Sequence, residues 1–178
     1  ALGGGRARAS VGVNATGRIQ QTRAGPFAGQ LSFAGSGLTG TVRLADQGGL
    51  QRADVDARAF AARIPGAVDF TIGRALVTAS VVLAKQPRIV ADAQVANLRY
   101  GTFILSSARA KVNYAGGNGT VQAVASGSSG VPFQLAANAR LNPRDWLIAL
   151  QGQANGIAFR SASPLHVQPI GGSYRLLP

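Results

Sequence analysis

The stretch Val-Pro-Phe-Gln-Leu-Ala-Ala-Asn-Ala-Arg-Leu, residues 131–141, decides the fold class. Its odd positions are all apolar, among them Val131, Phe133 and Leu135, whereas its even positions are mostly polar. Because successive side chains of a strand point to opposite sides, this alternation predicts a β-strand with one apolar and one solvated face. No stretch of the chain shows a helical period as clean as this alternation, so we predict an all-β chain.

The same alternation recurs on both sides of this stretch, and glycine-rich clusters such as Gly116-Gly117-Asn118-Gly119 separate the segments. Short links of this kind favour antiparallel pairing of successive strands. Only in the alanine-rich stretch 52–63 does a short helix compete with a strand. The predicted segments are Ser10–Ala15, Gln30–Ala34, Leu38–Ala45, Leu50–Phe60, Ala75–Ala84, Arg88–Leu98, Thr102–Ala115, Thr120–Ser126, Val131–Leu141, Trp146–Ala154 and Ile157–Val167.

The apolar positions are filled mainly by Ala, Val, Leu and Ile, with seven Phe, three Tyr and one Trp in 178 residues. An alanine-lined face buries little area, and each buried Å² contributes only about 25 cal/mol. We therefore expect a long, curved, mostly antiparallel sheet that folds partly over itself, and not a compact sandwich. Residues 1–178 form one such segment of a longer protein, in which the Gly- and Arg-rich residues 1–9 are loosely ordered.

The chain is strongly basic, with 18 Lys and Arg against six acidic residues and a net charge of +12. Such a surface favours anionic partners, but the arginines are spread singly, as expected for solvated strand faces and edges. The chain has no Cys, which excludes disulfides, thiolate chemistry and sulfur-ligated metals. No apolar run reaches the roughly 18 residues of a membrane-spanning helix.

The motifs that suggest chemistry have simpler explanations. Residues 35–40 spell GxGxxG, but the chain continues beyond them in strand period, which indicates a glycine hairpin and not a dinucleotide site. His166 is the single histidine, too few for a triad or a His-rich metal site. Asp54 and Asp56 share one strand face with flanking arginines, which favours an ion ladder over acid–base catalysis. We predict no enzyme activity, cofactor, metal or nucleic-acid partner.

The texture of the segments Ala93–Val112 and Gly119–Ala139 resembles the AsmA-like/TamB family, whose members string together many strands punctuated by Gly. The resemblance covers residues 30–167 and rests on this sequence pattern, which is rich in Ala, Leu, Val and Gly. It implies a periplasmic protein of a Gram-negative bacterium, anchored in the inner membrane, whose sheet forms a taco-shaped groove with an apolar interior. Members of this family are thought to conduct phospholipid to the outer membrane or to assist outer-membrane protein assembly.

With this resemblance, we expect the chain to be a groove segment that carries phospholipid acyl chains, with arginines at the rim near head-group phosphates. Three alternatives stay open: a chaperone-like module that binds strands of outer-membrane β-barrels with a TamA-like barrel partner, a transmembrane β-barrel, and a secreted structural β-domain. The residues expected to contact lipid are Leu31, Phe33, Val42, Leu44, Val77, Val81, Leu83, Ile89, Val95, Val112, Val121, Phe133, Leu135, Ile148, Leu150 and Phe159.

Overall fold

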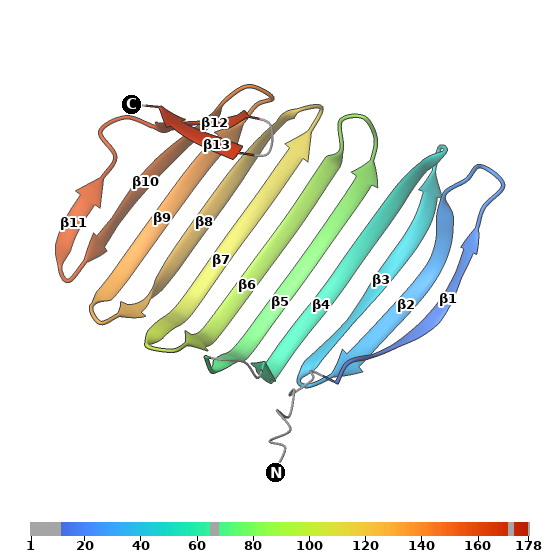
Figure 1. Cartoon of the computed structure of the whole chain (residues 1–178), viewed down its shortest axis with the longest axis horizontal. Helices are drawn as coiled ribbons and strands as arrows, with labels where there is room; N and C mark the ends of the chain where they lie inside the picture. Colours follow the sequence, from blue (N-terminus) through green and yellow to red (C-terminus); the bar gives the residue numbers. More distant parts are fainter. Residues whose placement is uncertain (1–11, 65–67, 171–172, 178) are drawn as a thin grey trace, which may run out of the picture.

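The computed structural model describes residues 12–64, 68–170 and 173–177, and these form strands, turns and short links without a helix (Figure 1). The predicted all-β fold is confirmed, whereas the expectation for residues 1–9 lies outside the described residues. The strands are β1 (Asn14–Gln21), β2 (Phe27–Gly35), β3 (Leu38–Gln47), β4 (Leu50–Ile64), β5 (Phe70–Leu83), β6 (Arg88–Tyr100), β7 (Phe103–Ala115), β8 (Asn118–Ser129), β9 (Pro132–Leu141), β10 (Trp146–Ala154), β11 (Ile157–Arg160), β12 (Leu165–Ile170) and β13 (Ser173–Leu177).

All of these strands belong to one curved antiparallel sheet, and from β1 to β10 each strand pairs with the next one in the chain (Figure 1). The outer edge of β10 is shared, because β11 pairs with its second half and β12 with its first half. In the described part of the chain β1 pairs only with β2, so the sheet stays open. The predicted long antiparallel sheet is therefore confirmed, and no described strand is left to form a second layer.

Tight turns with positive φ angles explain why glycine clusters separate the strands. The predicted glycine hairpin at residues 35–40 is confirmed, since Ser36 and Gly37 connect β2 to β3 with φ angles of 51° and 79°. Positive φ at both central residues defines a type I′ turn, whose twist matches that of the flanking strands. The same sign of φ recurs at the turns 48–49, 116–117 and 155–156.

The predicted strand Leu50–Phe60 is confirmed over the competing helix, since the alanine-rich stretch 52–63 lies in β4, where pairing on both sides overrides the helix propensity of alanine. Several other predicted boundaries were wrong. The segment predicted at Ile157–Val167 is divided into β11 and β12 by a link that contains Pro164. Strand β13 was not predicted, and β1 extends to Gln21, well beyond the predicted segment Ser10–Ala15, of which residues 10 and 11 lie outside the described part.

A line of irregular positions crosses the sheet from β4 to β7. Its members, Ala61, Gly73, Asn97 and Ser106, follow one another on neighbouring strands and are skipped in the pairing registers. β8 has no such residue, since its adjacent Ser126 and Gly127 pair on the two sides of Ser106. The register is unchanged across Ala61, Gly73 and Asn97, and it shifts by one residue only between β7 and β8, so Ser106 is a β-bulge against β8. We call these four residues the irregular row, and the side-chain alternation of each strand inverts across it.

Candidate functional site: an uncovered apolar face

The register of the sheet collects the apolar side chains on one face. Residues that pair directly across an antiparallel ladder lie on the same face, so the pairings define rows that run across the strands. From the row of Trp146 to the row of Phe133, these rows contain no charged side chain. Their members from β10 to β4 are Trp146, Leu141, Gly119, Tyr114, Ile89, Val81 and Ala53; Ile148, Ala139, Val121, Val112, Ala91, Ala79 and Val55; Leu150, Ala137, Ala123, Ala110, Ala93, Val77 and Ala57; Gly152, Leu135, Ala125, Ala108, Val95, Ala75 and Ala59; and Ala154, Phe133, Gly127, Leu105, Leu98, Ile72 and Ala62.

All of the residues predicted to contact lipid share this face. The rows continue onto β3 and β2 through Val42 and Leu31 and onto β11 through Phe159. Leu83 has the same phase but pairs with Gln51 at the end of its ladder, where 57% of its surface is exposed. The register thus groups the predicted residues, but their contact with lipid stays a prediction.

No described strand covers this apolar face. Among the described residues only Pro26, Ala59, Ala62 and Gly117 are buried, and no large side chain is fully buried. The apolar side chains of the central strands are instead partly exposed, as the alternating pattern of β7 illustrates. Soluble domains normally bury such a face against a second layer, and a large exposed apolar patch marks a surface that binds something.

The apolar face has a strip of small side chains along its middle, which we call the alanine trough. It consists of two adjacent rows with Val77 and Val95 as the largest members, namely Gly40, Ala57, Val77, Ala93, Ala110, Ala123 and Ala137, and Ala59, Ala75, Val95, Ala108 and Ala125. It is bordered on one side by the row that contains Val55, Val112 and Val121 and on the other side by Leu98 and Leu105. The trough therefore runs across the strands, along the length of the sheet.

Aromatic rings cover glycines at several places on the same face. A Cβ atom added to Gly127 would lie 3.0 Å from the ring of Phe133, which itself stacks on Phe103 with ring centroids 5.9 Å apart. The rings of Phe33, Tyr114 and Phe159 lie over Gly40, Gly119 and Gly152 in the same way. Such pairs compensate for the missing glycine side chain within a sheet. They explain why glycines are tolerated in strand interiors here.

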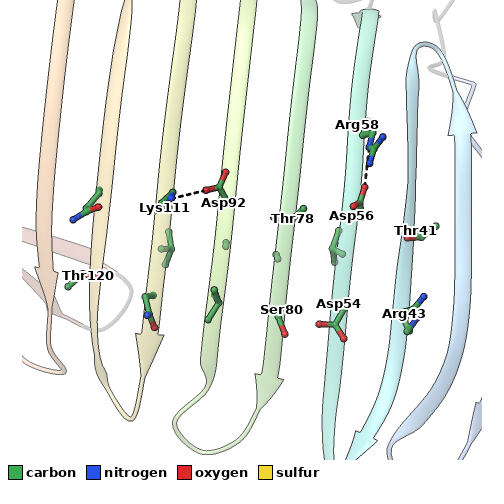
Figure 2. A pocket seen from close by; sticks show the side chains of 17 residues that line it. Thr41, Arg43, Asp54, Asp56, Arg58, Thr78, Ser80, Asp92, Lys111 and Thr120 are labelled. Atoms are coloured by element: carbon green, nitrogen blue, oxygen red, sulfur yellow. Dashed lines mark ion pairs between the residues drawn. The ribbon is translucent and has the colours of Figure 1, made fainter.

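The opposite face is polar and carries a hollow of about 900 Å³ across strands β3 to β8 (Figure 2). Three carboxylates line it, and each faces a cation: Asp54 lies 2.8 Å from Arg52, Asp56 lies 3.5 Å from Arg58, and Asp92 lies 3.8 Å from Lys111. The hollow is thus on the polar and not on the apolar face. The prediction that apolar side chains line the inside of a groove stays a prediction.

Asp54 has the most strongly engaged carboxylate of this hollow. The Arg52 guanidinium donates hydrogen bonds of 2.8 and 3.0 Å to it and lowers its pKa, against a smaller opposing effect of burial. Asp54 therefore stays ionised and paired. Asp54 and Asp56 lie on the same polar face, so the predicted ion ladder is confirmed. A general base would instead need a raised pKa near neutrality.

The remaining titratable group singled out from the sequence is His166, which lies on β12 between β10 and β13. Its Nδ1 atom is 3.2 Å from Asp145 in the link before β10. Within the described residues no group of three or more His, Cys, Asp and Glu side chains lies close enough to hold a metal ion. The described residues also include no helix that is long and apolar enough to cross a membrane.

The sequence analysis missed the alanine trough. Its alanines were visible as the apolar phase of their strands, but only the register shows that they are neighbours. Comparison of the chain with protein-family models, with curated proteins and with solved structures finds no match. The resemblance to the AsmA-like/TamB family therefore stays a prediction.

Proposed function

We propose that this chain is a segment of a periplasmic bridge protein, anchored in the inner membrane, whose apolar face holds phospholipid acyl chains on their way between the two membranes. The observation that carries the proposal is the continuous apolar face, free of charged side chains and covered by no described strand. Each methylene group that leaves water on such a surface contributes about 0.8 kcal/mol. A bound acyl chain can therefore cover the apolar face in place of a second protein layer.

The alanine trough suggests where an acyl chain lies. Neighbouring strands are about 4.8 Å apart, so the trough from Gly40 on β3 to Ala137 on β9 is roughly 29 Å long. Small side chains such as Ala110 and Ala123 leave room for a narrow linear chain, and the flanking larger side chains confine it. The trough also runs along the sheet, which is the direction of transfer in a bridge.

A second candidate function rests on β1, which pairs only with β2 in the described part of the chain. All eight residues of β1 are exposed, and the strand contains no Pro or Lys of the kind that protects natural edges. An extended segment of another protein could add a strand there by main-chain hydrogen bonding. This strand favours a chaperone-like module for strands of outer-membrane barrels as the alternative function.

Photo-crosslinking tests the lipid proposal directly. A crosslinking residue at Leu135, on the apolar face, should capture phospholipid, whereas one at Gln134, its neighbour on the polar face, should not. The two positions share one strand and differ only in face, so Gln134 is the matched control. Equal capture at both positions would contradict the proposal.

A charge placed on the apolar face distinguishes a lipid-binding surface from an ordinary folded core. Leu135→Asp places a carboxylate in the path of the acyl chains, where a buried unpaired charge costs several kcal/mol. Because the face is uncovered in the free chain, the carboxylate can stay hydrated there, so Leu135→Asp should abolish lipid binding while the sheet stays folded. Gln134→Asp should change neither property. If Leu135→Asp fails only because the chain unfolds, the face is an ordinary closed core.

A further inference from the structure

The two rims of the sheet, where the strands turn, differ in charge. The upper rim in Figure 1 contains the turns after β1, β3, β5, β7 and β9. Arg23, Lys85 and Arg144 lie in three of these turns, and all three are exposed. No carboxylate forms an ion pair with any of them in the described part of the chain. Arg88 adds a fourth unpaired cation where β6 begins.

The turns of the lower rim lack this charge, and the exposed cation nearest to them without an ion pair is Arg99, one residue before the end of β6. The described turns there contain no cation and one carboxylate, Asp69, which lies 3.2 Å from Arg63 in β4. Next to the lower rim the sheet carries an aromatic pair, in which the ring centroids of Phe70 and Tyr100 are 6.1 Å apart. The cations of the turns that the structure describes are thus all at the upper rim.

The carboxylates at the upper rim are already engaged. Asp46 accepts a 2.7 Å hydrogen bond from the Gly49 backbone N–H and a 3.3 Å hydrogen bond from the Thr22 hydroxyl. Asp145 lies 3.2 Å from His166 through Oδ2, while its Oδ1 is buried without a hydrogen-bond partner. None of the rim cations forms an ion pair with a described carboxylate, so these cations remain available to an external anion.

The middle turns of the upper rim touch one another, so their cations belong to one continuous surface. A Cβ atom added to Gly117, between β7 and β8, would lie 2.9 Å from the ring of Pro143 and 3.6 Å from the amide of Gln86. These two neighbours are each next to a cation, Arg144 and Lys85 respectively. The rows of the apolar face begin directly below this surface.

We propose that the upper rim binds the phosphates of phospholipid head groups, so that the lipids enter the apolar face from this rim alone. This inference rests on the proposed function, because it assigns the head groups of lipids whose acyl chains lie on the apolar face. Phosphate oxygens accept hydrogen bonds from Arg and Lys. The acyl chains of a lipid whose head group binds at Lys85 would lie over Ile89 and Tyr114 and then over Ala91 and Val112, which border the alanine trough.

Charge reversal at the two rims tests this inference. The rim variant is Lys85→Glu/Arg144→Glu, and the control is Arg74→Glu/Arg99→Glu, two exposed unpaired cations toward the lower rim with the same change in net charge. The probes are dioleoyl phosphatidylglycerol and dioleoylglycerol, which has the same acyl chains but no phosphate. Binding to the full chain is measured by displacement of a fluorescent fatty acid.

We expect the rim variant to bind phosphatidylglycerol at least about tenfold more weakly, since each such cation typically contributes about fivefold. Its binding of dioleoylglycerol and both affinities of the control variant should stay unchanged. Equal losses of phosphatidylglycerol binding in both variants, or none in either, would overturn the inference while the lipid proposal stands. If the unmodified chain binds neither lipid, the proposed function itself fails.

Discussion

Filling the alanine trough should block acyl chains without harming the fold. Ala137→Leu places a large side chain in the trough on β9, while Ala136→Leu makes the same change on the polar face, where Ala136 pairs with Val124 and Gln151. Blocking one strand spacing of about 4.8 Å displaces roughly three methylene groups of a bound chain. At about 0.8 kcal/mol each this is about 2.4 kcal/mol, or roughly a 60-fold weaker affinity.

The assay measures two quantities for each variant, the dissociation constant of a fluorescent phospholipid and the free energy of unfolding in urea. Ala137→Leu should weaken binding and leave the unfolding free energy within about 0.5 kcal/mol of the original, because nothing lies over the trough to clash. Ala136→Leu should change neither. In a closed core, by contrast, Ala137→Leu would cost about 1–3 kcal/mol through overpacking. A loss of that size, or equal binding losses in both variants, would refute the reasoning.

Three further predictions concern stability. Ala61 has a φ angle of 46°, so Ala61→Gly should raise the unfolding free energy by roughly 0.5–1 kcal/mol in urea unfolding, whereas Ala57→Gly in regular strand should lower it. Phe133→Ala removes a stacked ring and should lower the unfolding free energy by at least about 1 kcal/mol. Arg52 lowers the pKa of Asp54 in the folded chain. The ion pair of these two residues therefore stabilises the fold above the ordinary pKa of Asp, and this stabilisation is lost as the pH falls through the lowered pKa. The difference in Tm between Arg52→Gln and the original chain should therefore exist at pH 7 and shrink as the pH falls below the ordinary pKa of Asp; a difference that does not shrink in acid would contradict this account.

The irregular row shows which features of the sheet follow from the sequence of one strand and which follow from the pairing between strands. Within β7 the apolar phase changes between Leu105 and Ala108, and a similar change occurs in β6 around Asn97. Both changes are visible in the sequence as breaks in the alternation. The register places these breaks side by side on neighbouring strands. As a result, the apolar residues return to one face on all four strands.

The sequence by itself determined the two faces of each strand, because side-chain direction follows from a period of two within a single segment. It also determined the hairpins, since glycine at positive φ is a local requirement. Which residues become neighbours across strands was decided only by the register, and so were the alanine trough, the continuous apolar face and the charge difference between the rims. The sequence also did not predict which face of the sheet carries the hollow. The curvature of a sheet arises from the pairing of all its strands and not from the pattern within any one of them.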